Sequence, residues 1–152
     1  ERGWAETVGG ADGIELNALW PPADYETRRV NDTSIVLSVE VAGKRILLNG
    51  DIQSEAMSQL MELEDLLADI TDLPHHGSIV EGSAEWLGQV DPSIILQSCG
   101  RTRMYQDKWI PILEGRDVQR LVTARDGMSQ VRIENDGYIN TWFLVNRRSQ
   151  MK

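Results

Sequence analysis

The feature that most constrains the fold is a pair of short apolar segments joined by a tight turn. Residues 35–41 place apolar side chains at alternate positions, the turn Ala42-Gly43-Lys44 follows, and residues 45–48 return as a second apolar segment. A period of two is typical of strands, and the intervening turn predicts a hairpin. Any fold for this chain must therefore contain a sheet built around residues 35–48.

Helical spacing begins directly after this hairpin. Ser54 is a suitable N-cap for an amphipathic helix over residues 55–67, and residues 84–89 have the pattern of a second helix. Residues 70–73 and 93–97 have the apolar character of buried strands. Strands that alternate with helices predict an α/β fold with layers around a mixed sheet.

Four further strands are expected outside this central region, over residues 14–20, 121–124, 130–133 and 138–145. We expect residues 1–13 to be a loop or a severed end, and residues 146–152 to be a terminal tail. The length of 152 residues, with 41% hydrophobic and 26% charged residues, is typical of one globular domain. We therefore expect a single, partial domain over residues 1–152.

The sequence gives little information about cellular location. No run approaches the roughly 18 apolar residues that a membrane helix requires. The chain begins at Glu1 rather than Met and carries no signal-peptide pattern, so we expect it to be part of a longer protein. Two locations stay open, the bacterial cytoplasm and attachment to a membrane protein outside the cytoplasm.

The formal net charge of -9 argues against broad, unspecific binding to nucleic acid, which needs a basic face. The charge is uneven, however, and basic residues gather late in the sequence, at Arg101, Arg103, Lys108, Arg116, Arg120, Arg125, Arg147, Arg148 and Lys152. Such a strip either holds a phosphate backbone or forms an ordinary solvated surface.

The two histidines of the chain are adjacent, at His75 and His76, and a glycine follows them. Histidine is the commonest metal ligand and titrates near neutral pH, so this pair is a candidate functional site, while a satisfied structural role is the alternative. Asp51 stands in an equivalent position after the apolar residues 46–48. Its carboxylate is a candidate metal ligand, while a turn or a cap for the helix near Ser54 is the structural alternative.

The remaining reactive or aromatic residues favour structural roles. Cys99 is the single cysteine, which excludes a disulfide framework, and its place after a strand-like run favours a small buried residue. Packing is favoured over base stacking for the five tryptophans, Trp4, Trp20, Trp86, Trp109 and Trp142.

Several short motifs follow one another in a specific order: Asn31-Asp32-Thr33-Ser34, Leu47-Leu48-Asn49-Gly50-Asp51-Ile52, Leu73-Pro74-His75-His76-Gly77-Ser78 and Ser98-Cys99-Gly100. This series resembles the metallo-β-lactamase superfamily, and within it the hydrolase domain of ComEC-like competence proteins. The resemblance spans residues 19–133. It implies an αββα sandwich of two mixed sheets, of which this chain is the C-terminal portion, and a site for two divalent metals, zinc or manganese.

The resemblance also implies metal-dependent hydrolysis of a phosphodiester or nucleic acid, in the ComEC group during DNA uptake. Asp51 would bridge the two metals, and His75 and His76 would meet the metals or the substrate phosphate. One histidine would be a ligand and the other would orient a neighbour or donate a proton. Further contacts to substrate are expected from polar residues nearby, namely Ser78, Arg101 and Arg103. A plain surface role is the alternative for the two arginines, and a cap for the following segment is the alternative for Ser78.

The chain departs from the family pattern in two places. The His-x-His-x-Asp-His motif is absent, since both histidines lie at residues 75 and 76. Where relatives often carry a His-Pro, this chain has Asp107, which is either a replacement oxygen ligand or an exposed loop carboxylate. A catalytic zinc usually takes three protein ligands. We therefore expect weak or no metal binding, and no turnover, from this chain alone.

Two functions remain open. The chain is the C-terminal part of a hydrolase whose N-terminal half lies outside it, or it is a degenerate, metal-free binding or scaffold module. In the first case we expect an exposed apolar face where the missing half would pack, with formation of a homodimer as one consequence.

Overall fold

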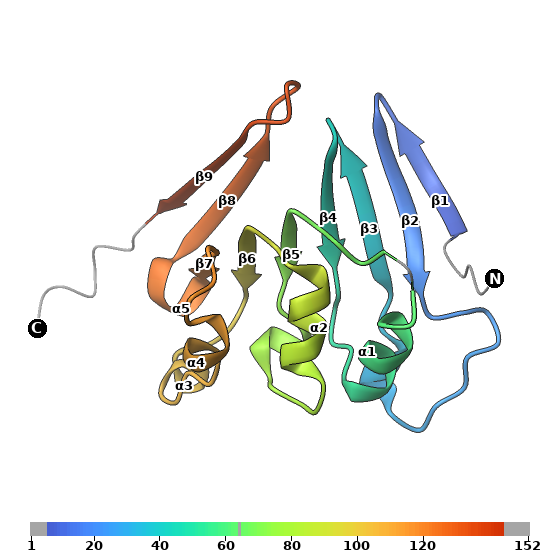
Figure 1. Cartoon of the computed structure of the whole chain (residues 1–152), viewed down its shortest axis with the longest axis horizontal. Coiled ribbons are helices and arrows are strands. Elements are labelled where there is room, and N and C mark those ends of the chain that lie inside the picture. Colours follow the sequence, from blue (N-terminus) through green and yellow to red (C-terminus); the bar gives the residue numbers. More distant parts are fainter. Residues whose placement is uncertain (1–5, 64, 145–152) are drawn as a thin grey trace, which may run out of the picture.

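The computed structural model describes residues 6–63 and 65–144. Its strands are β1 (Glu6–Ala11), β2 (Ile14–Trp20), β3 (Val36–Val41), β4 (Lys44–Leu48), β5 (Ile70–Asp72), β6 (Ile94–Gln97), β7 (Gln119–Val122), β8 (Met128–Ile133) and β9 (Ile139–Leu144). Strands β1 to β7 form one sheet in sequence order, and β8 pairs with β9 in a second, two-stranded sheet (Figure 1).

The seven-stranded sheet has two parts. Strands β1 to β4 pair antiparallel, whereas β4 to β7 pair parallel. Parallel neighbours need a crossover connection, and helices provide it here. These helices are α1 (Ser54–Leu60), α2 (Ser83–Val90), α3 (Arg101–Met104) and α4 (Trp109–Leu113), with α5 (Thr123–Asp126) after β7 and short 3-10 turns η1 (Val30–Thr33) and η2 (Pro74–Gly77). The chain is a mixed α/β fold, as the sequence predicts.

The predicted hairpin over residues 35–48 is confirmed, with Leu37 paired to Leu48 and Val41 to Lys44. The prediction of a loop over residues 1–13 is wrong for residues 6–11, which form β1. Asp12 and Gly13 both have positive φ angles, 52° and 81°, and turn the chain back so that Ala11 pairs with Ile14. An edge strand needs no apolar face, so the hydrophobic pattern did not reveal it. Residues 1–5 and the predicted tail 146–152 lie outside the described residues.

Helix α1 differs from its prediction at both ends. It stops at Leu60 rather than at residue 67, and Ser54 does not cap it. The buried carboxylate of Asp32, in η1, accepts hydrogen bonds from the backbone N–H groups of Gln53 (2.5 Å) and Ala56 (3.4 Å) instead. A residue more than twenty positions away thus supplies the cap, which no local pattern can show.

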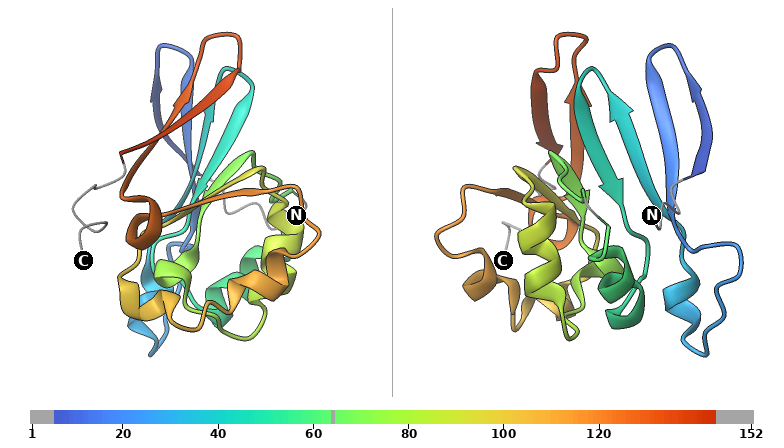
Figure 2. Two further views of the ribbon diagram at one scale, coloured as in Figure 1. Left: turned by 90° about the vertical axis from the view of Figure 1, so that its left-hand side faces the viewer. Right: turned by 45° about the vertical axis from the view of Figure 1, so that its right-hand side comes forward.

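Two apolar clusters lie on opposite faces of the large sheet. The main cluster packs side chains of α1, α2 and α4 against the sheet and includes Trp20, Trp86 and Trp109, each at most 2% exposed. The smaller cluster packs Ile70, Ile94 and Leu121 against the β8–β9 hairpin. Figure 2 shows the helices on one side and this hairpin on the other. Packing is confirmed for these three tryptophans, whereas Trp142 is 46% exposed and Trp4 lies outside the described residues.

Within the described residues, none of the helices combines the length and the apolar character that crossing a membrane would require.

Candidate functional site

The candidate residues gather at one edge of the sheet. Because β4, β5, β6 and β7 are parallel, their carboxyl ends meet at the same edge, toward the bottom of Figure 1. The loops after these strands carry Asp51, the histidine pair and Ser98. Turn η1 reaches the same edge, because β3 runs antiparallel to β4 and begins beside its end. In sheets with parallel strands this edge is the usual place for a ligand.

The histidine pair lies in a left-handed turn. His75, His76 and Gly77 have φ angles of 49°, 58° and 79°, so three consecutive residues adopt a conformation that L-residues disfavour. For the two histidines this strain costs roughly 1–3 kcal/mol each, whereas glycine adopts the conformation freely, and it persists only where the surroundings impose it. The turn is therefore held by contacts from outside itself.

Hydrogen bonds from neighbouring elements fix this turn. The N–H of His75 donates to the carbonyl of Gly50, 2.9 Å away, which ties the loop after β5 to the loop after β4. Each carbonyl of the turn then accepts from a different donor: His75 O from Ser78 N (3.0 Å), His76 O from Gln97 Nε2 (3.2 Å) and Gly77 O from Trp109 Nε1 (2.9 Å).

A buried ion pair supports Gln97 in turn. Arg120 donates from Nε to Gln97 Oε1 (2.9 Å) and from Nη2 to Asp107 Oδ2 (2.7 Å). The side chains of Arg120 and Asp107 are only 8% and 9% exposed. Asp107 is thus a buried, paired carboxylate, which corrects the alternative of an exposed loop carboxylate. Its other oxygen accepts from the N–H of Trp109.

The structure brings Asp51 and His76 together. Asp51 Oδ1 lies 3.6 Å from His76 Nε2, and the side chains of Asp51 and His76 are 42% and 55% exposed. His76 Nδ1 lies 3.0 Å from the carbonyl of Ser98, which only accepts hydrogen bonds, so Nδ1 carries a proton. In the neutral ring, Nε2 then presents a lone pair toward the Asp51 carboxylate. Two electron-pair donors face each other, and a proton or a cation between them would satisfy both.

His75 has different surroundings. Its Nε2 lies 3.4 Å from Asn31 Nδ2, and its Nδ1 lies 3.3 Å from Gln53 Nε2. Each amide offers both a donor and an acceptor, because its oxygen and nitrogen exchange on a flip. A ring held by two amides is well fixed, so the geometry distinguishes His75 from the Asp51–His76 pair.

A half-buried carboxylate lies beside this pair. Asp72, the last residue of β5, accepts from the backbone N–H of Asn49 at 2.7 Å and from its side-chain amide at 3.0 Å. Burial raises the pKa of Asp72, and the charge of Asp51 adds to the effect, while the bonds from Asn49 oppose it. Asp72 and Gln97 were absent from the sequence-based candidates. Both could have been recognised in the sequence, because each polar residue follows an apolar run that forms a parallel strand ending at this edge.

The predicted substrate residues separate into two groups. Ser78 and Arg103 are in contact, with Arg103 Nη1 donating to the Ser78 hydroxyl, whereas Arg101 lies exposed on α3. Cys99 is half-buried rather than buried, and burial raises the pKa of its thiol while Arg120 and Arg103 oppose that shift. Among the described residues, no group of three or more His, Cys, Asp or Glu side chains is arranged to hold a metal ion.

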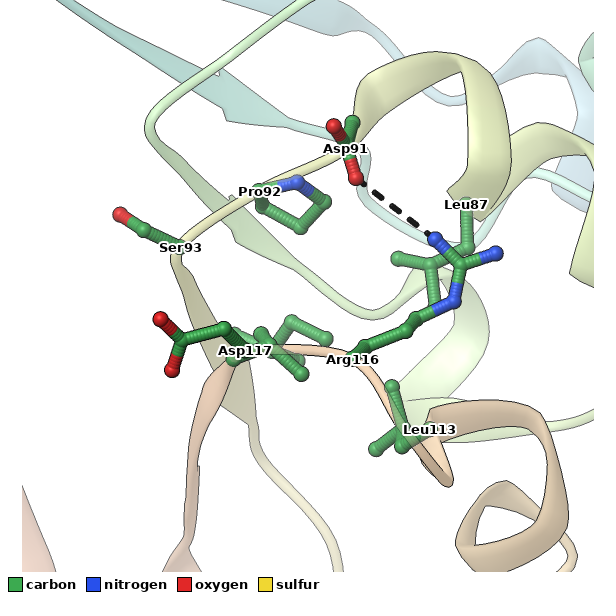
Figure 3. Close-up of a pocket in the computed structure, with 9 residues that line it drawn as sticks. Leu87, Asp91, Pro92, Ser93, Leu113, Arg116 and Asp117 are labelled. Atoms are coloured by element: carbon green, nitrogen blue, oxygen red, sulfur yellow. Dashed lines mark ion pairs between the residues drawn. The ribbon is translucent and has the colours of Figure 1, made fainter.

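A separate pocket of about 300 Å³ lies at the opposite edge of the parallel strands. Asp91 and Ser93 precede β6, and Arg116 and Asp117 precede β7, so the pocket is at the amino ends of these strands (Figure 3). Arg116 Nη1 and Asp91 Oδ1 are 3.6 Å apart across it. This pocket has no contact with the histidine turn and is not part of the candidate site.

Comparison with known proteins gives two distant relatives. The chain is 28% identical over 126 residues to ComE operon protein 3 of Bacillus subtilis (strain 168), covering 80% of this chain and 16% of that protein. It is 25% identical over 144 residues to the uncharacterized protein YcaI of Escherichia coli (strain K12), covering 91% of this chain and 18% of that protein. The chain therefore spans less than a fifth of the length of either relative. No family model matches it.

Proposed function

We propose that the carboxyl edge of the parallel strands is part of the active site of a phosphodiester hydrolase, and that this chain is the C-terminal portion of a metallo-β-lactamase-like domain. The order of the motifs and the distant similarity to ComE operon protein 3 support a competence-related protein that acts on DNA. In this proposal the domain lies in the cytoplasm or is attached to a membrane protein.

The observation that carries the proposal is the convergence of Asp51 and His76. A carboxylate oxygen and an imidazole nitrogen lie 3.6 Å apart on loops that follow two different strands. A strained turn, held from outside by hydrogen bonds to the carbonyls of His76 and Gly77, aims the ring. Strain that surrounding contacts maintain is common at functional sites.

Asp51 and His76 have complementary roles in this proposal. The Ser98 carbonyl fixes the proton on His76 Nδ1, so Nε2 is the atom that gains and releases a proton. The carboxylate of Asp51 stabilises the protonated ring. A protonated Nε2 can then give its proton to the leaving oxygen of a phosphodiester, as a general acid does. His75, held between Asn31 and Gln53, positions the turn.

The donors in this chain do not make a complete metal site. Asp51 supplies one ligand, and His76 supplies none while it acts as the acid, whereas a catalytic zinc takes three ligands from the protein. Metal dependence, on two zinc or manganese ions, is therefore proposed for the longer protein, with the other ligands outside this chain. The missing half of the sandwich would cover the sheet face that β8–β9 leaves open, where Ile14 and Leu48 are 43% and 38% exposed.

The proposal is tested with the longer protein, purified with zinc or manganese present. Metal content and cleavage of bis(p-nitrophenyl) phosphate are measured before and after treatment with a chelator. We expect bound metal, and cleavage that is lost on chelation and restored by adding the metal back. A protein that retains no metal and cleaves no phosphodiester would contradict the proposal.

A second function, a metal-free binding or scaffold module, is favoured by the lack of a three-ligand cluster among the described residues. The encoded sequence upstream of Glu1 discriminates between the two. A His-x-His-x-Asp-His motif there supports the hydrolase, whereas an unrelated domain supports the module.

A further inference from the structure

A small pocket lies directly beside the histidine turn. Its volume is about 220 Å³, and it shares Gly77 with the turn. Its lining also includes Ser78, Arg103, Asp107, Lys108 and Trp109. Pockets that hold drug-sized ligands are usually about 300–1,000 Å³, so this one fits a smaller group.

The charge of the lining is positive. Arg103 and Lys108 contribute two cationic side chains. Asp107 is the acidic residue of the lining, but its charge is offset by Arg120, 2.7 Å away in a pair shielded from water. An anion in the pocket would therefore meet two cations and no uncompensated carboxylate.

The hydrogen-bonding groups also suit an anion. Arg103 donates to the Ser78 hydroxyl oxygen, which leaves the hydroxyl proton of Ser78 for a further acceptor. The indole N–H of Trp109 donates to the carbonyl of Gly77, so this wall of the pocket is fixed by the same bond that holds the turn.

The position of the pocket relates it to the Asp51–His76 pair. Gly77 directly follows His76, and Gln97, which also lines the pocket, donates to the His76 carbonyl. Resting on the function proposed above, we propose that Ser78, Arg103 and Lys108 bind one backbone phosphate of a nucleic-acid strand, adjacent to the phosphodiester at Asp51 and His76. The pocket would thus set the register of the strand on the site.

The test measures binding alone, with the 152-residue chain in the absence of metal. A fluorescein-labelled ten-nucleotide thymidine strand is titrated, and Kd is obtained from anisotropy at several salt concentrations. Arg103→Gln and Lys108→Gln should each weaken binding about tenfold, because each removes a charge-assisted hydrogen bond. The slope of log Kd against log salt should fall by about 0.7 for each lost phosphate contact.

Arg116→Gln is the matched control, since it removes the same charge from the pocket at the opposite edge. It should leave Kd within about twofold, and a strand with neutral methylphosphonate linkages should bind the wild-type chain at least about tenfold more weakly. Thermal unfolding checks that each variant is folded. Equal losses for Arg103→Gln and Arg116→Gln, or no binding by the wild-type chain at millimolar concentration, would overturn the inference.

Failure here and failure of the hydrolase proposal are distinguishable. If the chain binds the strand through Arg103 but the longer protein cleaves no phosphodiester, only the hydrolase proposal is contradicted. If the longer protein cleaves phosphodiesters and Arg103→Gln leaves its KM unchanged, only the proposed phosphate-binding role of the pocket is contradicted.

Discussion

Replacing Gly77 with alanine tests whether the close packing of the histidine turn is as tight as the structure indicates. Gly77 has a φ angle of 79°, and a Cβ atom there would lie against the side-chain amide of Gln97. Gly43 provides a matched control, because its φ angle is 70° and no atom lies within 4 Å of the Cβ position. Both substitutions impose the backbone strain, but only Gly77→Ala also displaces a neighbour.

The expected costs can be worked out separately. The left-handed conformation costs alanine about 1 kcal/mol, which is the whole effect expected for Gly43→Ala. Gly77→Ala additionally weakens the bond from Gln97 to the His76 carbonyl, worth about 1 kcal/mol, and disturbs the bond from Arg120 to Gln97, worth about 1.5–3 kcal/mol. Because both bonds are weakened rather than lost, we expect about 2 kcal/mol from displacing Gln97 and a total of roughly 3 kcal/mol for Gly77→Ala.

Urea denaturation of the 152-residue chain measures this difference in the free energy of unfolding. Thermal unfolding should agree, with Tm about 4–8 °C lower for Gly77→Ala than for Gly43→Ala. If the two variants lose the same stability, Gln97 moves aside without cost, and the reasoning that this contact holds the turn is refuted.

Three further substitutions test other parts of the account. Asp107→Ala leaves the buried Arg120 without its charged partner and should cost about 3–5 kcal/mol in urea denaturation. The double change Asp107→Ala/Arg120→Met should recover only part of this loss, because it also removes the bond from Arg120 to Gln97; equal losses would refute the pairing. Asp32→Ala removes the acceptor for the N–H groups of Gln53, just before α1, and Ala56, in its first turn, and should cost about 1–2 kcal/mol, with faster hydrogen exchange in that helix; unchanged exchange would show that Asp32 does not cap it. The raised pKa of Asp72 means that ionising it opposes folding, so its favourable contribution is complete below the unfolded-state pKa and is lost as pH rises through the folded-state pKa. Asp72→Asn should therefore be more stable than the wild-type chain at pH 7, and this advantage should vanish in acid; an advantage that grows in acid would contradict the assignment.

Much of the central fold could be predicted because its patterns are local. The alternation over residues 35–41 and the apolar run over residues 93–97 directly reflect burial of strand side chains, and both strands are confirmed as β3 and β6. The strand β1 could not be predicted in this way. It is an edge strand with two glycines, so its pairing depends on the turn at Asp12-Gly13 rather than on apolar side chains.

In the candidate site, too, the features with a local sequence pattern could be predicted, and the contacts between distant residues could not. Asp51 and the histidine pair were recognisable, because they stand at the ends of apolar segments that become parallel strands. The contacts that organise them join distant residues, as when Arg120 supports Gln97 and thereby the His76 carbonyl. Such contacts depend on strand order and register, which a single sequence does not specify. For the same reason, the pairing of Asp107 with Arg120 was not foreseen.

The central claim is that Asp51 and His76 act together on a phosphodiester at the carboxyl edge of the sheet. The most direct measurement is kcat for phosphodiester cleavage by the metal-supplied longer protein carrying Asp51→Asn, with Asp91→Asn at the opposite edge as the control. We predict a loss of about 100-fold or more for Asp51→Asn and an unchanged rate for the control. Equal rates for the wild-type protein and Asp51→Asn would contradict the claim.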